Sequence, residues 1–163
     1  KRRYTRRTAL NNIERIRSMM GEVMITADLM VGFPSESEED FLDTLRFVGE
    51  ARLLDAHVFA YSKREGTPAA NYVGQIPESI KRERSARLTL EVRRVRDEIL
   101  DGIVASEEPL MTVLEDEQNG RFRGHSDSYI EVSCTAVGHS RGDLVAVRPI
   151  SHSDGVVFGE IIS

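Results

Sequence analysis

The side chains of this sequence that could do chemistry include only one thiol. Cys134 is the single cysteine, so the chain can form neither an internal disulfide nor, by itself, a site built from several thiolates. Four histidines could also bind a metal: His57, His125, His139 and His152. No second ligand stands at a suitable spacing from His57, which favours a histidine packed within a strand over a metal ligand. The other three are scattered over turns, and the same interpretation is favoured for them.

The ends of two apolar runs point to ligand binding instead. Gly32 and Phe33 end the run 23–33, and Tyr61 ends the run 56–61. Ligands collect at the carboxyl ends of strands in parallel α/β barrels, and glycine lets a ligand approach the backbone closely. These three residues are therefore candidate ligand-binding residues. The alternatives are a strand-end turn for Gly32 and a core position for Tyr61.

Asp28 lies among apolar residues within the first run. A carboxylate is costly to bury without a partner. We therefore expect Asp28 to form a salt bridge or a hydrogen bond to the backbone, in preference to a contact with substrate.

The elements that must position these residues alternate between helix and strand. Thr5 can cap a helix whose apolar residues recur at three- and four-residue spacing. The run 23–33 is rich in branched apolar residues and predicts a strand covered on both faces. Ser35 or Ser37 then precedes three acids that suit the start of a second helix, and 56–61 predicts a second strand. This alternation predicts a parallel sheet, either doubly wound or wrapped as a barrel.

A long helix is expected after Pro77. Its apolar stripe advances in steps of three and four residues: Leu88, Val92, Val95, Ile99 and Ile103. Arginine and glutamate cover the opposite side, for which a solvated surface is expected. The preceding segment 62–77 contains two prolines and two glycines, which indicates a loop.

The residues after 106 have a different character. Five short β-rich runs are separated by glycines and polar turn residues: 110–114, 121–124, 129–133, 144–148 and 156–162. Such runs predict a small antiparallel barrel. We therefore expect two domains, 1–106 and 107–163.

The charge of the second domain bears on nucleic-acid binding. Residues 107–163 hold four arginines and ten acidic residues, a net charge of about −6. Non-specific binding to RNA requires a basic surface, because Lys and Arg must neutralise phosphates. A local set of cations and aromatic rings could nevertheless stack on bases: Arg121, Phe122, Arg123, His125 and Tyr129. Both interpretations stay open.

Four short segments, in one order along about the first 90 residues, carry a more specific signal. They are Arg2-Arg3-Tyr4-Thr5, 28–41 (DLMVGFPSESEEDF), 57–69 (HVFAYSKREGTPA) and 81–84 (KRER). Together they resemble consecutive landmarks in the C-terminal part of the radical S-adenosylmethionine methylthiotransferases. Ser35 stands where that family usually has glycine, and Ala60 and Lys63 stand where proline is common.

The resemblance implies an α/β fold, in which the C-terminal units of a partial parallel β/α barrel precede a small all-β TRAM (OB-like) barrel. It also implies that S-adenosylmethionine lies near Gly32, Phe33 and Tyr61, with Arg2 and Arg3 close to its methionine end. Two 4Fe–4S clusters are implied for the full-length enzyme, held by cysteines upstream of residue 1. This chain alone is therefore expected to bind no cluster and to be inactive.

The same resemblance implies the reaction. S-adenosylmethionine is cleaved to a radical that removes hydrogen from the target carbon, and a second cluster delivers a methylthio group. The words Arg-Arg-Tyr-Thr and His-Val-Phe most resemble the branch that converts N6-threonylcarbamoyladenosine at tRNA position thirty-seven to its 2-methylthio form. The expected partner is then tRNA.

Two alternatives to this function stay open. One is the branch that modifies an aspartate of a ribosomal protein, a basic partner that an acidic barrel would suit. The other is a non-catalytic module that binds RNA or protein. The sequence has neither a signal peptide nor an apolar run long enough to span a membrane, so a cytoplasmic protein without a membrane partner is expected.

Overall fold

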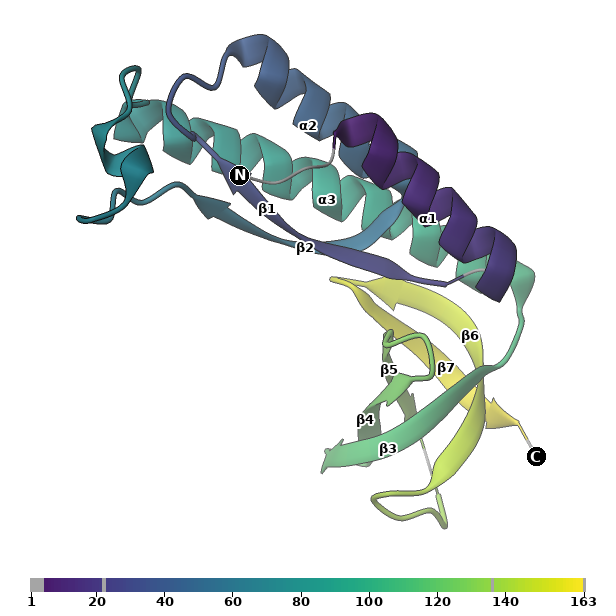
Figure 1. Ribbon diagram of the computed structural model, residues 1–163. Helices are drawn as coiled ribbons and strands as arrows, with labels where there is room; N and C mark the ends of the chain where they lie inside the picture. The colour runs from purple at the N-terminus through teal and green to yellow at the C-terminus, as the bar shows by residue number, and fades with distance from the viewer. Residues whose placement is uncertain (1–4, 22, 136, 163) are drawn as a thin grey trace. The chain divides into compact units, whose positions relative to one another are not determined.

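The computed structural model describes residues 5–21, 23–135 and 137–162. Its elements follow one another as helices and parallel strands and then as an all-β region (Figure 1). They are α1 (Arg6–Met20), β1 (Ile25–Val31), α2 (Glu38–Ala51), β2 (Leu53–Ala60), the 3-10 helix η1 (Pro68–Asn71), α3 (Glu78–Ser106), β3 (Leu110–Gln118), β4 (Arg121–Ser126), β5 (Glu131–Thr135), β6 (Leu144–Ser153) and β7 (Val156–Ile162). Contacts divide the chain into two compact units, Lys1–Val95 and Arg96–Ser163. Because this division falls within α3, the domain boundary expected near residue 107 stays a prediction.

The first two helices begin where the sequence places a cap. Thr5 caps α1 and exchanges hydrogen bonds with Thr8 in a capping box. Ser37, and not Ser35, caps α2, and Asp40 completes a second capping box. Because these side chains satisfy backbone N–H groups that a helix start leaves without partners, both helix starts are encoded locally.

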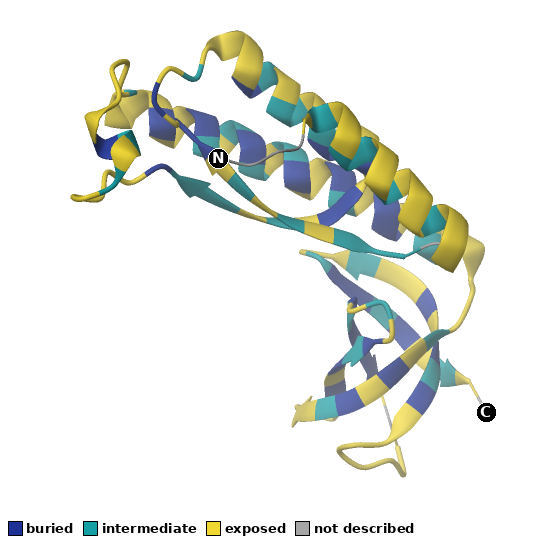
Figure 2. Cartoon of the chain, viewed as in Figure 1, coloured by how far each residue is buried: buried dark blue, intermediate teal, exposed yellow. Residues whose placement is uncertain are grey.

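The strands β1 and β2 form the parallel pair that the alternation of helix and strand predicts, with Asp28 opposite His57 in the register. The expectation that both faces of β1 would be covered is wrong. Every second residue of β1 is exposed, as the colouring in Figure 2 shows. The reason is that α1, α2 and α3 lie on the same side of the strands (Figure 1), so no described helix covers the other face.

Asp28 belongs to that exposed face, and the salt bridge or backbone hydrogen bond expected for it is not found within the described part of the chain. Its carboxylate has no salt bridge and no hydrogen bond to any described residue. Because it lies in contact with solvent, it avoids the cost of burial without a partner. His57 is likewise exposed and stacks on the ring of Phe59, with ring centroids 5.4 Å apart.

The helix α3 buries most of the predicted apolar stripe. Leu88, Val92, Val95 and Ile99 are at most 5% exposed. Lys81 and Arg84 are also buried, at 4% and 5% exposed, and they lie on the same side as the stripe, because they precede Leu88 by steps of three and four residues. Helical periodicity places positions 81 and 84 on the buried side, but it could not reveal the partners that make burial of two cations possible, while their long apolar stems lie along the core.

The five strands of the second unit close into a barrel in the order β3-β4-β5-β7-β6. All five β-rich runs of the sequence are strands. The expectation of a purely antiparallel barrel is wrong, because β5 and β7 pair in parallel. The strand β6 lies between β5 and β7 in the sequence and is antiparallel to β7. Because the chain reverses direction once on entering β6 and again on entering β7, β7 runs in the same direction as β5. Alternate inward residues, including Leu114, Val132 and Val157, form the barrel core.

Close backbone contact in the barrel depends on Gly124. A Cβ atom at this position would lie 1.8 Å from the carbonyl oxygen of Val113. Only glycine allows β3 and β4 to approach in this way.

Among the described helices, none is both long and apolar enough to cross a membrane.

Candidate functional site

Gly32, Phe33 and Tyr61 come together at the carboxyl ends of β1 and β2, as the sequence predicts. The backbone N–H of Tyr61 donates to the carbonyl of Val31 at 2.8 Å, which extends the pairing of the two strands to this point. The rings of Phe33 and Tyr61 meet edge to face, with centroids 5.3 Å apart. The ends of two parallel strands thus present an aromatic surface on which a ligand could pack.

Tyr72 adds a third ring that sequence reasoning missed. Its centroid lies 6.1 Å from that of Phe33, again edge to face. The residue follows η1 within the segment 62–77, whose prolines and glycines predict a loop but not a direction. A spacing rule could not have found Tyr72, because the contact depends on how this loop folds back to β1.

Gly32 has a backbone conformation and an environment that favour glycine. Its φ angle is +71°, and a Cβ atom would lie 2.4 Å from Cγ of Lys81. The Lys81 side chain thus passes directly against the backbone at the end of β1. Any larger residue at position 32 would have to displace this buried lysine stem.

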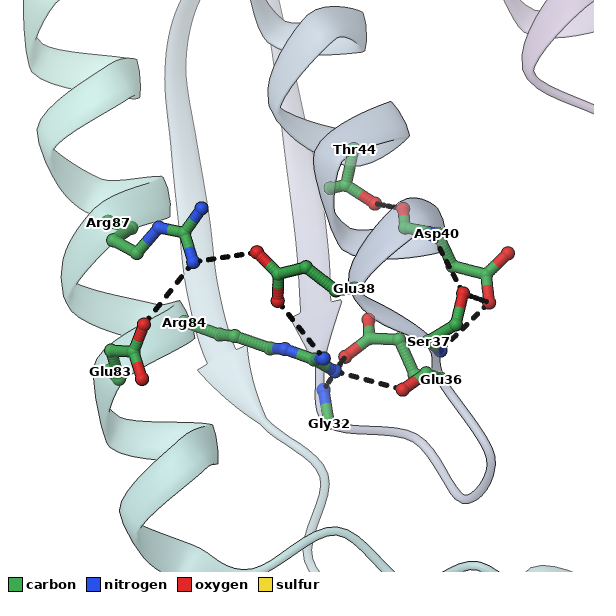
Figure 3. A network of polar contacts seen from close by, with 9 residues as sticks. All are labelled: Gly32, Glu36, Ser37, Glu38, Asp40, Thr44, Glu83, Arg84 and Arg87. Carbon is green, nitrogen blue, oxygen red and sulfur yellow. Dashed lines mark hydrogen bonds and ion pairs between the residues drawn. The ribbon is translucent and has the colours of Figure 1, made fainter.

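The loop after β1 is held by a buried ion pair between Glu36 and Arg84 (Figure 3). Arg84 Nη1 lies 2.6 Å from Glu36 Oε2 and donates a second bond, of 3.1 Å, to the carbonyl oxygen of Glu36. The same Oε2 atom accepts from the backbone N–H of Gly32 at 2.7 Å. The side chains of Arg84 and Glu36 are only 7% and 11% exposed, so solvent screens this link weakly.

A more exposed set of charges surrounds the buried pair. Glu38 accepts from Arg87 at 2.9 Å and from Arg84 at 3.4 Å, and Arg87 also reaches Glu83 (Figure 3). The hydrogen bond from Arg87, together with the positive charges of Arg87 and Arg84, holds the pKa of Glu38 below its usual range. The guanidinium of Arg87 also lies 4.7 Å from the centre of the Phe41 ring.

Lys81 holds the end of β2 as Arg84 holds the loop after β1. Its Nζ donates to the backbone carbonyl of Tyr61 at 2.9 Å and to Glu78 at 2.7 Å. Lys81 and Arg84 belong to the segment 81–84 that resembles the family, and their three-residue spacing places them on one side of α3. This spacing was the available signal for a shared role.

We define the strand-end cluster by the residues that these contacts join: Gly32, Phe33, Glu36, Tyr61, Tyr72, Lys81 and Arg84. The cluster contains the predicted ligand-binding residues Gly32, Phe33 and Tyr61. Arg2 and Arg3, the other two, lie outside the described residues.

The strand-end cluster combines aromatic surface with a hydroxyl group that has no partner among the described residues. The Phe33 side chain belongs to a residue that is 41% exposed, and Tyr61 is 8% exposed. The hydroxyl of Tyr61 is buried without a hydrogen-bond partner among the described residues. A buried hydroxyl without a partner is rare in a complete protein and is satisfied when a ligand supplies one. These residues therefore fit S-adenosylmethionine.

The chain does not fit an iron–sulfur cluster. Its one cysteine, Cys134, is buried in the barrel core, where burial raises the pKa of the thiol against the opposing effect of Arg121. The described residues contain no group of three or more side chains arranged to hold a metal. The histidines have other contacts: His125 binds Glu115 and His152 binds Asp101, each at 2.9 Å, and His139 lies 3.5 Å from Asp143.

Two of the five predicted RNA-binding residues are tied to the barrel itself. Arg121 donates to the side chain and the carbonyl of Ser133 at 3.2 and 3.1 Å, and its guanidinium lies over the ring of Phe158. Phe122 is 5% exposed and belongs to the barrel core. Stacking of the Phe122 ring on a base does not fit this burial.

The other three predicted RNA-binding residues lie on the barrel surface. The rings of His125 and Tyr129 stack with centroids 4.9 Å apart, and Tyr129 is 79% exposed. Arg123 forms an ion pair with Glu131 at 3.0 Å. An exposed ring fixed by a second ring is a suitable surface for a base.

The acidic balance of the barrel also has a location. A cavity of about 330 Å³ is lined by three acidic residues, an arginine, a histidine and two uncharged residues: Glu115, Asp116, Glu117, Arg141, His139, Phe122 and Ser140. Such a lining does not favour phosphate, because the carboxylates repel it.

Comparison with known proteins finds relatives whose names describe enzymes of tRNA modification. It is 37% identical over 150 residues to a tRNA-2-methylthio-N(6)-dimethylallyladenosine synthase of Lachnoclostridium phytofermentans, covering 90% of this chain and 32% of that protein. It is 37% identical over 158 residues to the enzyme of the same name from Rhodococcus jostii, covering 96% and 29%. It is 32% identical over 156 residues to the threonylcarbamoyladenosine tRNA methylthiotransferase MtaB of Bacillus subtilis, covering 91% and 34%. No family model matches the chain.

The chain thus spans about a third of the length of these curated relatives. The predicted resemblance to methylthiotransferases is confirmed by matches that cover nine tenths or more of the chain. The ribosomal-protein alternative gains no support from them. The matches to these relatives agree with the motifs at the strand ends. The chain therefore belongs to the radical S-adenosylmethionine methylthiotransferase family.

Proposed function

We propose that this chain is the C-terminal segment of a tRNA methylthiotransferase, composed of the last units of its radical S-adenosylmethionine barrel and a TRAM domain. The observation that carries this proposal is the strand-end cluster. It joins the carboxyl ends of two parallel strands, where α/β barrels bind their ligands, and it contains exposed aromatic surface and a buried hydroxyl without a partner. The closed five-stranded barrel of the second unit agrees with a TRAM domain of OB-like form.

Each predicted ligand-binding residue has a physical task in this proposal. Phe33 and Tyr61 pack against the adenine ring, and the Tyr61 hydroxyl supplies a hydrogen bond to the bound cofactor. Gly32 leaves room for the Lys81 stem against the end of β1, so that Phe33 is held beside the bound cofactor. Arg2 and Arg3 pair with the carboxylate at the methionine end of the cofactor. When bound, S-adenosylmethionine supplies the radical that removes hydrogen from the target carbon.

The two 4Fe–4S clusters of the full-length enzyme are held, in this proposal, by cysteines outside the segment. The segment contributes a wall of the cofactor site and no cluster ligand. We therefore expect the segment alone to be inactive as a methylthiotransferase.

The substrate we propose is N6-threonylcarbamoyladenosine at tRNA position thirty-seven. The words Arg2-Arg3-Tyr4-Thr5 and His57-Val58-Phe59 favour this branch of the family. A second candidate is N6-dimethylallyladenosine, because the relatives from L. phytofermentans and R. jostii carry that name and are 37% identical, against 32% for MtaB. Both are modified adenosines of tRNA, so the reaction class is the same.

The experiment uses the full-length protein that contains this segment, reconstituted with iron and sulfide and supplied with S-adenosylmethionine and a one-electron reductant such as dithionite. Two tRNAs are offered separately, one carrying threonylcarbamoyladenosine and one carrying dimethylallyladenosine. Mass spectrometry of the digested nucleosides should detect the 2-methylthio form of the first. Methylthiolation of the second alone would assign the other substrate, and an unchanged nucleoside in both reactions would contradict the proposed function.

Within this function we propose that the barrel contacts tRNA through Arg121, Arg123, His125 and Tyr129, with Phe122 as a core residue beneath them. The stacked pair of His125 and Tyr129 supports this proposal, since an exposed ring can hold an unstacked base. The acidic charge of the domain implies a local contact, with most phosphate contacts made elsewhere in the full-length protein.

A further inference from the structure

Lys81 and Arg84 connect α3 to the ends of two different strands. Lys81 Nζ donates to the carbonyl of Tyr61 at the end of β2, at 2.9 Å. Arg84 donates to the carboxylate and the carbonyl of Glu36 in the loop after β1, at 2.6 and 3.1 Å. Both residues are at most 5% exposed. One turn of α3 thus fixes the positions of both strand ends relative to each other.

Glu36 transmits this restraint to the backbone of Gly32. Its Oε2 atom accepts simultaneously from Arg84 and from the Gly32 N–H group, which is 2.7 Å away. Phe33 is the next residue in the chain. The direction in which Phe33 leaves β1 therefore depends on a carboxylate that Arg84 holds in place.

Stability alone does not account well for such a pair. Removing two charges from water is costly, and replacement of a buried ion pair by apolar residues is often neutral or even stabilising. The hydrogen bonds of a guanidinium and a carboxylate do, however, fix direction as well as distance. A pair at this place is therefore better suited to set the geometry of its neighbours than to add stability.

We propose that Lys81 and Arg84, through Glu36 and the Tyr61 carbonyl, are positioning residues for S-adenosylmethionine. They hold Gly32, Phe33 and Tyr61 in the arrangement that receives the adenine end of the cofactor, without touching it themselves. The inference rests on the proposed function, since it assigns these residues to the cofactor site of that reaction.

The test measures cofactor binding by the full-length protein with its clusters reconstituted. The dissociation constant for S-adenosylmethionine is determined by equilibrium dialysis for the wild type, Glu36→Gln, Arg84→Lys and the double variant. Glu36→Gln keeps the side-chain shape and removes the charge, whereas Arg84→Lys keeps the charge and removes the planar guanidinium that directs Nη1 at both oxygens of Glu36. Arg87→Gln is the matched control, because Arg87 lies three residues beyond Arg84 on α3 and its ion pairs with described residues are to the exposed side chains of Glu38 and Glu83, not to Glu36.

We expect each single substitution to weaken cofactor binding about 10-fold, as loss of a residue that orients a binding group commonly does. The double variant should be little worse than either single variant, because both break the same link. The KM for S-adenosylmethionine should rise while kcat at saturating cofactor changes by less than about twofold. Arg87→Gln should leave the dissociation constant within about twofold of the wild type.

Several outcomes would overturn the inference. Unchanged cofactor binding in folded Glu36→Gln and Arg84→Lys proteins would leave the pair with a structural role only. Failure of the wild type itself to bind S-adenosylmethionine would remove the proposed function and this inference together, which distinguishes the two failures. Iron content and the absorption spectrum of the clusters establish that the variants differ at the cofactor site alone.

A second measurement uses only the wild-type protein, so it does not require that any variant folds. In the wild-type protein, hydrogen exchange is compared with and without S-adenosylmethionine. Cofactor binding should slow exchange in residues 31–37 and also in the first turns of α3, because the contacts of Arg84 with Glu36 and of Lys81 with Tyr61 couple these segments. Protection of 31–37 without any change in α3 would contradict the coupling.

Discussion

Ser35 and Gly74 meet backbone to backbone although they are far apart in the sequence. The N–H of Ser35 donates to the carbonyl of Gly74 at 2.8 Å, and Ser35 Oγ donates to the carbonyl of Val73 at 3.1 Å. Ser35 has a φ angle of +67°, in the left-handed region that favours glycine. The left-handed conformation is thus adopted here by a residue that is less suited to it than glycine.

Ser35→Gly and Ser35→Ala should therefore differ in stability. Glycine relieves strain of about 1–2 kcal/mol and loses the hydroxyl hydrogen bond, while alanine loses the same bond and keeps the strain. We expect Ser35→Ala to be less stable than Ser35→Gly by about 1–2 kcal/mol. Urea unfolding of the chain measures the difference, and equal midpoints would show that position 35 carries no strain.

Gly124→Ala should destabilise the barrel. A methyl group there would collide with the Val113 carbonyl, which belongs to the backbone and cannot move aside easily. The expected loss is about 1–3 kcal/mol or more. Gly102→Ala is the control: no atom lies within 4 Å of a Cβ at that position in α3, so it should stabilise the helix by about 0.5–1 kcal/mol. Thermal unfolding should shift in opposite directions for the two variants.

The thiol of Cys134 should react slowly in the folded chain. Burial raises its pKa, and the thiolate is the reactive form. The single cysteine makes labelling with a disulfide reagent a direct measure of barrel opening. The raised pKa means that the folded state favours the neutral thiol of Cys134. The resulting contribution to the free energy of unfolding is complete below the ordinary thiol pKa and is lost as the pH rises through the folded value. Gly124→Ala should accelerate labelling, and rapid labelling of the wild type would contradict burial of Cys134.

The capping box of α2 should lower the pKa of Asp40. Hydrogen bonds from the side chain and the backbone N–H of Ser37 hold this pKa below its usual range. The folded pKa is depressed, so this contribution to stability is present above the ordinary value and is lost as the pH falls through the folded one.

Ser37→Ala should raise the pKa of Asp40 towards its usual range and destabilise the start of α2 by about 0.5–2 kcal/mol. Thr44→Ala is the control, because Thr44 donates only to the backbone carbonyl of Asp40. An NMR titration of the Asp40 carboxyl group provides the comparison. An unchanged pKa in Ser37→Ala would assign the shift to the backbone N–H of residue 37 and to the charge of Arg84.

Tyr129→Ala should weaken tRNA binding by the full-length protein. Loss of one base stacked on an aromatic ring costs about 1–3 kcal/mol. Tyr129→Phe retains the ring and should bind nearly as well as the wild type. Arg141→Ala removes an exposed cation of the same barrel without removing a ring, so it should change the salt dependence more than the affinity at fixed salt. Equal binding by Tyr129→Ala and Tyr129→Phe would exclude a stacking role.

Much of the fold follows from local patterns in the sequence. Thr5 and Ser37 mark helix starts because a side-chain oxygen satisfies backbone N–H groups nearby, whatever the tertiary structure. The five β-rich runs separated by turn residues are all strands, and the alternation of helix and strand correctly indicates parallel pairing of β1 and β2. The meeting of Phe33 and Tyr61 then follows, because the carboxyl ends of neighbouring parallel strands lie at one edge.

Other features were decided only by the tertiary structure. The run 23–33 is apolar, but whether both of its faces are covered depends on which elements lie beside it, and no helix among the described residues covers the face that contains Asp28. The parallel direction of β7 beside β5 depends on the path of the connecting strand, which no short pattern encodes.

The burial of Lys81 and Arg84 shows the same division most clearly. The sequence by itself determined that these cations share one side of α3, since that follows from helical periodicity. Their partners, the carboxylate of Glu36 and the carbonyl of Tyr61, come from distant parts of the chain. A cation is solvated unless such partners compensate for the loss of water, so only the folded arrangement decided that these two charged side chains are buried.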